Sequence, residues 1–194
     1  MSETFGQLDE VLVTLAEKGE HRDRLAVASR GVSAEKIRVC FVCSGNICRS
    51  PTAEGVFKKL VVEAGLEHAF HVESAGIGSW HVGERPDPRT IRAAVARGYR
   101  LDSRAQHWKA RDFDRFDYVV AMDKTHVLAL VRLAASEALK AKISLARDHV
   151  TDGPRDADVP DPYYEELDAF DEVVDICRDA CAALLADLRR KHKL

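Results

Sequence analysis

The sequence lacks the features that mark a membrane protein or a secreted one. No apolar run approaches the roughly 18 residues of a membrane-spanning helix. The first residues, MSETFGQLDEVLVTL, have neither the basic start nor the long apolar stretch of a signal peptide. The five cysteines are an odd number, which argues for reduced thiols rather than a disulfide framework. We therefore expect a cytoplasmic protein without a membrane span.

The chain also lacks an excess of positive charge, and it shows no internal repeat. Its 29 Lys and Arg residues against 32 Asp and Glu residues give a net charge of −3, which argues against a nucleic-acid partner. Any anion site must then be a local arrangement of dipoles and side chains. Cys177 and Cys181 lie one helical turn apart without histidines at ligand spacing, so we interpret them as core thiols, and no metal or other cofactor is expected.

Short apolar runs typical of buried strands alternate with segments of helical periodicity along most of the chain. The patterns predict strands at 37–43, 70–74, 117–122 and 142–145, and helices at 51–65, 88–97, 124–135 and 165–191. This alternation indicates an α/β fold: a three-layer sandwich with a four-stranded parallel sheet, helices on both faces and a flavodoxin-like topology. Ligands of such folds bind at the carboxyl ends of the strands.

Residues 1–35 precede the first predicted strand and form a segment of their own, while 36–194 form the main domain. Phe5, Leu8, Leu12 and Leu15 lie at helical spacing, which predicts a short amphipathic helix in an N-terminal helical extension. A helix docked on the main domain, a mobile arm and a partner-binding helix are the alternatives for this extension.

The most informative segment is IRVCFVCSGNICRSP at residues 37–51. A buried strand ends at Cys43, a short loop follows, and Pro51 suits the first turn of a helix. Backbone N–H groups at a helix N-terminus favour a bound anion, and Gly45 allows the loop to approach it closely. Arg49 supplies a planar fork for two phosphate oxygens. The same field stabilises a thiolate at Cys43, which is then a nucleophile for phosphorus.

The alternative for Cys43 is a small buried hydrophobic side chain at the end of a strand. A bare match to cysteine, five residues and arginine is common by chance. The strand–loop–helix context, with Ser44, Gly45 and Asn46 in the loop, favours the catalytic interpretation.

Four segments in order resemble the low-molecular-weight protein tyrosine phosphatases. VCFVCSGNICRSPTAEGVF resembles their signature loop and following helix, and VESAGIGSWHVGERPDPR resembles the second strand, the specificity loop and the next helix start. FDYVVAMD resembles the third strand, and VPDPYYEELDAF resembles the loop that holds the general acid. The resemblance covers about residues 36–192 and implies a phosphoric monoester hydrolase that acts on tyrosine-phosphorylated proteins. A tyrosine kinase is a further candidate partner.

Two Asp-Pro pairs compete for the role of general acid. Asp87 precedes Pro88 and a helical pattern, so we interpret it as a helix N-cap. Asp161 lies before Pro162 in an irregular polar stretch, where its carboxyl can project from a loop or cap a helix. The resemblance implies that Asp161 protonates the leaving oxygen and then activates water.

The resemblance also implies the substrate contacts and the supporting residues. Phosphate would contact Ser44, Gly45, Asn46, Ile47 and Cys48, and a flat phenyl ring would lie between Trp80, Tyr163 and Tyr164; the alternative for these aromatics is ordinary packing, which we expect of Trp108. Ser50 would donate a hydrogen bond to the Cys43 sulfur. Asp123 would brace the loop, cap the next helix, or both. Cys48 would form a reversible disulfide with Cys43 that protects it from overoxidation, or else be a packed thiol.

Two departures from the family pattern are visible. Ser103 stands where many members have a histidine that bonds to the loop asparagine, and Glu165 stands where a glycine commonly follows the paired tyrosines. Three rival functions remain. Arsenate reductase would need further cysteines between Cys48 and Cys177, arginine phosphatases favour threonine at the Ile47 position and lack the paired tyrosines, and a catalytically silent phosphopeptide-binding module would not need Asp161.

Overall fold

The computed structural model describes residues 35–150 and 157–194. The helix predicted around Phe5, Leu8, Leu12 and Leu15 lies outside the described residues. Among the described residues, no helix is both long enough and apolar enough to cross a bilayer.

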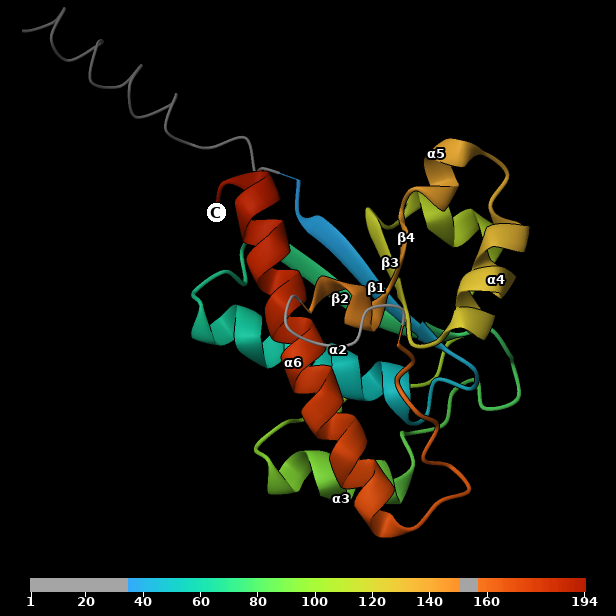
Figure 1. Cartoon of the computed structure of the whole chain (residues 1–194), viewed down its shortest axis with the longest axis vertical. Coiled ribbons are helices and arrows are strands. Elements are labelled where there is room, and N and C mark those ends of the chain that lie inside the picture. Colours follow the sequence, from blue (N-terminus) through green and yellow to red (C-terminus); the bar gives the residue numbers. More distant parts are fainter. Residues whose placement is uncertain (1–34, 151–156) are drawn as a thin grey trace, which may run out of the picture. The chain divides into compact units, whose positions relative to one another are not determined.

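Four parallel strands form one sheet in the order β2-β1-β3-β4 (Figure 1). The strands are β1 (Ile37–Cys43), β2 (Phe70–Gly76), β3 (Tyr118–Ala121) and β4 (Ile143–Leu145). The register pairs Cys43 with Gly76, so the ends of β1 and β2 meet at one edge of the sheet. The predicted fold class and strand segments are confirmed, with β2 two residues longer than predicted.

Helices cover both faces of the sheet (Figure 1). The helical segments are α2 (Arg49–Glu63), α3 (Pro88–Ala96), α4 (Lys124–Leu133), α5 (Glu137–Lys140) and α6 (Leu167–His192), with short 3₁₀ helices η1 (Ala110–Asp114) and η2 (Ala146–His149). Helices α2 and α3 pack against α6 on one face. The sequence did not predict α5, η1 or η2, because segments of four or five residues are too short to show a helical period.

Strand β1 is buried on both sides, which creates two cores. Phe41 faces one core, where its ring packs 5.7 Å from that of Phe57 on α2. Val42 faces the other core, which contains Trp108 and Phe113 in an edge-to-face pair at 5.1 Å. A strand covered on both faces is held rigidly, so the loop that follows Cys43 starts from a fixed point.

Candidate active site

The sulfur of Cys43 lies inside the loop that joins β1 to α2. Cys43 is buried, and its Sγ accepts hydrogen bonds from the backbone N–H of Asn46 at 3.2 Å and from the Ser50 hydroxyl at 3.0 Å. These two donors hold the sulfur in place within the loop. The predicted contact between Ser50 and Cys43 is present.

Asn46 fixes the shape of this loop. Its backbone adopts the left-handed region, with φ of 58°, and its side chain is buried. The amide nitrogen donates to the hydroxyls of Ser50 and Ser74, both at 2.8 Å, and the amide oxygen accepts the backbone N–H of Gln106 at 2.8 Å. Because the Ser50 oxygen accepts from Asn46, its own proton is available to the Cys43 sulfur.

The partners of the Asn46 amide are therefore Ser50, Ser74 and Gln106. Ser103, which stands where many family members have a histidine that bonds to the loop asparagine, is not one of these partners. The departure leaves the loop asparagine fully bonded, because a hydroxyl from β2 and a backbone N–H from residue 106 supply the contacts.

Gly76 allows the loop to lie directly on the end of β2. A Cβ atom at this position would come within 2.8 Å of the Ser44 carbonyl oxygen and 3.1 Å of the Asn46 nitrogen, which are both backbone atoms. Backbone cannot swing aside as a side chain can, so the close approach requires glycine.

Two carboxylates hold the guanidinium of Arg49. Its Nη1 lies 2.7 Å from Oδ2 of Asp123, and its Nη2 lies 2.6 Å from Oδ2 of Asp161. Nη2 also donates to the hydroxyl of Ser44 at 3.1 Å. Arg49 is almost fully buried, so its plane is fixed before any ligand arrives, and a phosphate would compete with Asp161 for Nη2.

Asp123 both caps a helix and pairs with Arg49. It caps α4 by accepting the backbone N–H of His126 at 2.9 Å, and it pairs with Arg49. Burial raises the pKa of its carboxyl, but hydrogen bonds from Thr125 and the His126 backbone and the neighbouring charges outweigh burial and hold that pKa below its ordinary value. Asp123 is therefore a fixed negative partner for Arg49.

His126 closes a ring of contacts around Arg49 that the sequence had not indicated. Its Nε2 lies 2.9 Å from the Ser44 hydroxyl, and its Nδ1 lies 3.0 Å from Oδ1 of Asp123 without the alignment of a hydrogen bond. The ring thus runs from Arg49 to Asp123, His126, Ser44 and back to Arg49. Burial lowers the pKa of His126 to about 4, so the imidazole is neutral at pH 7.

The sulfur and Arg49 line a cavity of about 290 Å³. Its other lining residues come from three segments: the loop with Ser44, Gly45, Ile47 and Cys48, the segment with Trp80 and His81, and the segment with Asp161, Tyr163 and Tyr164. The structure thus brings together the predicted nucleophile, cation, acid and aromatic residues in one place.

The family model described as low molecular weight phosphotyrosine protein phosphatase matches residues 38–194. The chain belongs to this family. A low molecular weight protein-tyrosine-phosphatase of Streptomyces coelicolor is 48% identical over 157 residues, which cover 79% of this chain and 94% of the relative. Phosphatases of this family are hydrolases, so the chain is a hydrolase.

Solved structures agree with this assignment. A protein tyrosine phosphatase from Entamoeba histolytica, crystallised with Hepes in its active site, has a TM-score of 0.77 and 38% identity, covering 82% of this chain and all of the other. A Drosophila arginine phosphatase has a TM-score of 0.73 and 31% identity, covering 79% of this chain and 98% of the other. The fold is thus shared by phosphatases of two substrate classes.

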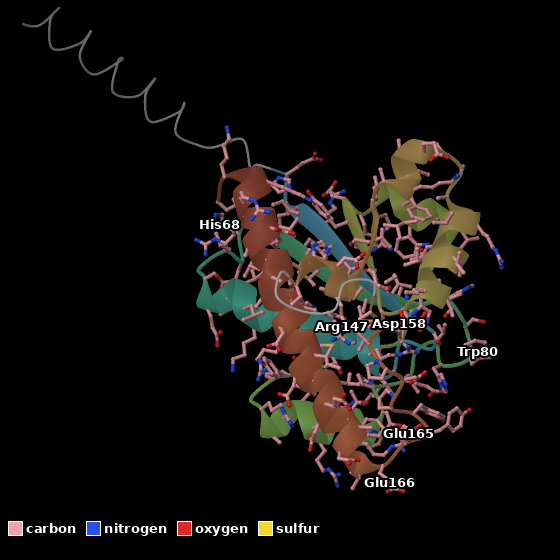
Figure 2. All side chains as sticks on the ribbon, viewed as in Figure 1. His68, Trp80, Arg147, Asp158, Glu165 and Glu166 are labelled. Atoms are coloured by element: carbon pink, nitrogen blue, oxygen red, sulfur yellow. The ribbon has the colours of Figure 1, made fainter. Side chains whose placement is uncertain are left out.

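Two aromatic residues of this phosphatase are largely exposed at the cavity mouth. Trp80 is 73% exposed and Tyr164 is 92% exposed. Figure 2 shows Trp80 on the segment that follows β2, and Glu165 and Glu166 on the segment that leads into α6. Such exposure leaves large apolar surface available to a ligand. Trp108, by contrast, is buried in the core as predicted.

Arg89 ties α3 to the acid segment, a role that the sequence had not indicated. Asp87 caps α3 as predicted, through the backbone N–H of Arg89, and its carboxylate also accepts from the Arg89 side chain at 2.9 and 3.1 Å. Arg89 in turn donates to the Tyr163 carbonyl at 3.1 Å. Asp87 does not line the cavity, and its contact with Arg89 connects it to the backbone of Tyr163.

The remaining cysteines differ from Cys43 in their surroundings. Burial, together with the charge of Asp87, raises the pKa of Cys48 to about 12, so Cys48 stays a thiol although it lines the cavity. Cys177 and Cys181 are buried in the core, as predicted, and their thiols lie against carbonyl oxygens of α2. Their burial raises both thiol pKa values, which makes them poor nucleophiles.

Proposed function

We propose that this phosphatase hydrolyses phosphotyrosine through a cysteinyl-phosphate intermediate on Cys43. The observation that carries the proposal is the common cavity, where the sulfur, the Arg49 guanidinium and the Asp161 carboxylate lie beneath exposed aromatic side chains. Residues 36–194 would form the catalytic domain.

In the first step, the Cys43 sulfur attacks phosphorus. Phosphate oxygens bind Arg49 and the N–H groups of residues 44–49, which stabilise the charge of the transition state. The phosphate must displace Asp161 from Nη2 of Arg49, because both anions need the same donor. The displaced Asp161 carboxylate takes up a proton from solvent, lies beside the substrate and donates that proton to the leaving oxygen.

In the second step, water attacks the phosphorus of the intermediate and the sulfur leaves. Asp161, now a carboxylate, accepts a proton from the water, and inorganic phosphate forms. Ser50 donates to Sγ at 3.0 Å, which stabilises the thiolate as the P–S bond breaks. No step requires a metal, because the loop and Arg49 supply the positive field.

The cavity walls favour a phenyl ring over a short alkyl chain. Trp80, Tyr163 and Tyr164 give the cavity depth, so a phosphoserine would be too short to bring its phosphate to the sulfur. Arginine phosphatase activity is the second candidate, since the fold hosts it. Ile47 in the loop and the paired tyrosines argue for phosphotyrosine.

The test is a kinetic comparison of matched phosphotyrosine, phosphoserine and phosphoarginine peptides. We expect turnover of the phosphotyrosine peptide alone, and no turnover by Cys43→Ser. Preferred turnover of phosphoarginine would change the substrate class, and phosphate binding without any turnover would leave only a binding module.

We also propose that Cys48 protects the nucleophile as a redox partner, in a reducing cytoplasmic setting where a tyrosine kinase opposes this enzyme. All five cysteines are free, and both Cys43 and Cys48 line the cavity. After mild peroxide treatment, peptide mass spectrometry should find a Cys43–Cys48 crosslink that thiols reverse. Sulfinic acid on Cys43 without that crosslink would contradict the protective role of Cys48.

A further inference from the structure

A second cavity, of about 780 Å³, opens beside the active site. Ser79, Val82 and Gly83 form one wall, and these residues flank Trp80 and His81, which line the active-site cavity. Residues 103–109 form the opposite wall. Backbone hydrogen bonds of 2.9 Å, from Gly83 to Ala105 and from Ala105 to Glu84, tie the two walls together. The segment 79–83 therefore separates the two cavities and lines both, and we call it the shared partition.

The floor of this second cavity is apolar and contains an unsatisfied donor. Cys40, Ala75, Trp108 and Phe116 lie at the floor and are buried. The indole N–H of Trp108 has no hydrogen-bond partner among the described residues. A buried donor without a partner costs free energy, which a backbone carbonyl of a bound polypeptide would recover by accepting this hydrogen bond.

The rim of the second cavity is cationic, although the whole chain carries a net charge of −3. Arg115 forms ion pairs with two carboxylates, Glu73 at 3.0 Å and Asp112 at 3.1 Å. Lys109 and Arg111 are exposed and have no carboxylate partner in the described part of the chain. The Arg104 side chain donates to the Gly83 carbonyl, at 2.9 Å. The described lining thus carries four cations against two carboxylates, a net charge of +2.

We propose that this second cavity is a docking site for an acidic segment of the phosphoprotein substrate, with an apolar side chain on the floor and carboxylates at the rim. The proposal rests on the proposed function. The cations are spread over residues 104–111 rather than gathered at one point, which suits several carboxylates on a polypeptide better than one compact phosphate. The shared partition places this polypeptide next to the phosphotyrosine held in the first cavity.

The test uses pairs of phosphotyrosine peptides that carry four glutamates around one leucine, placed either before or after the phosphotyrosine. The control peptides replace the glutamates by glutamines. We expect the intact chain to hydrolyse one acidic peptide with a kcat/KM about 3- to 10-fold above its control, as two or three exposed ion pairs allow. The preference should shrink as salt is added.

The variant Lys109→Ala/Arg111→Ala should lose this preference through KM, with unchanged turnover of nitrophenyl phosphate. Arg189→Ala/Lys191→Ala removes two cations with the same spacing from the end of α6 and should keep the preference. Equal kcat/KM for acidic and neutral peptides, or a preference that survives in Lys109→Ala/Arg111→Ala, would overturn the docking site. Absence of turnover for every phosphotyrosine peptide would instead overturn the proposed function.

A direct binding measurement completes the test. In a Trp80→Phe background, Trp108 is the one remaining tryptophan. Binding of the unphosphorylated acidic peptide should change the fluorescence of Trp108, while the glutamine peptide should leave that fluorescence unchanged. Identical titration curves for the two peptides would contradict a site selective for carboxylates.

Discussion

At the scale of single residues, the site is built from groups that hold one another in place. Arg49 is oriented by two carboxylates and a hydroxyl, and Cys43 Sγ accepts two hydrogen bonds. The strand–loop–helix pattern placed Cys43 and Arg49 on one loop, and the family resemblance pointed to Asp161 as the acid; the three residues line one cavity in the structure. His126 could not be predicted in this way, because only the fold brings α4 next to Ser44.

The first prediction concerns Asp161. Asp161→Ala removes the proton donor of the first step, which kcat/KM reports. The kcat/KM for phosphotyrosine should therefore fall by about 100-fold or more, and that for nitrophenyl phosphate much less, because nitrophenolate leaves without a proton. Steady-state kinetics with both substrates measures this. The same variant frees Nη2 of Arg49, so phosphate affinity should stay or improve. Equal slowing for both substrates would remove Asp161 from the acid role.

The second prediction concerns the contact between His126 and Ser44. Either His126→Ala or Ser44→Ala should weaken phosphate binding about 3- to 10-fold, as expected for the loss of one supporting hydrogen bond. The double variant should be little worse than either single one, because both break the same ring around Arg49. Isothermal titration with phosphate measures the effects, and Leu128→Ala, at an exposed position on α4, is the control. Fully additive losses would show that the two residues act independently.

At the scale of elements, the site depends on where β1 and β2 end. The sequence predicted both strands, and the loop follows β1 as expected. The contact of that loop with Gly76 could not be predicted, since it depends on the pairing of Cys43 with Gly76 across the sheet. The Arg89 contact with the acid segment likewise depends on how α3 and α6 pack.

The third prediction compares two glycines of one segment. Gly76→Ala would press a Cβ into backbone atoms of the loop at 2.8–3.1 Å, so kcat/KM for nitrophenyl phosphate should fall about 10- to 100-fold. Gly78→Ala would meet only the Trp80 ring, at 2.0–2.4 Å, and Trp80 is exposed enough to move away. Its effect on nitrophenyl phosphate should be small. Thermal unfolding should confirm that both variants fold, and equal activities would contradict the close packing.

At the scale of the whole molecule, folding keeps His126 neutral and buried. Since burial lowers its pKa from 6.5 to about 4, the unfolded chain binds this proton at higher pH than the folded chain does. The contribution of His126 to stability is therefore fully present above pH 6.5 and is lost as the pH falls toward 4.

The fourth prediction follows from this linkage. The loss amounts to about 3 kcal/mol in the free energy of unfolding, spread between pH 6.5 and 4. Urea unfolding at several pH values should show that His126→Asn, which cannot titrate, lacks this part of the decline. Parallel pH profiles for the two proteins would show that His126 does not contribute.

The central claim is that the Cys43 sulfur carries the phosphoryl group during turnover. Asp161→Ala mixed with nitrophenyl phosphate should accumulate the intermediate, because the first step proceeds without an acid while the second lacks its base. Rapid acid quench, digestion and mass spectrometry should then find the phosphoryl group on the peptide that contains Cys43, and none in the Cys43→Ser variant. A phosphoryl group on another residue, or continued turnover by Cys43→Ser, would contradict the account.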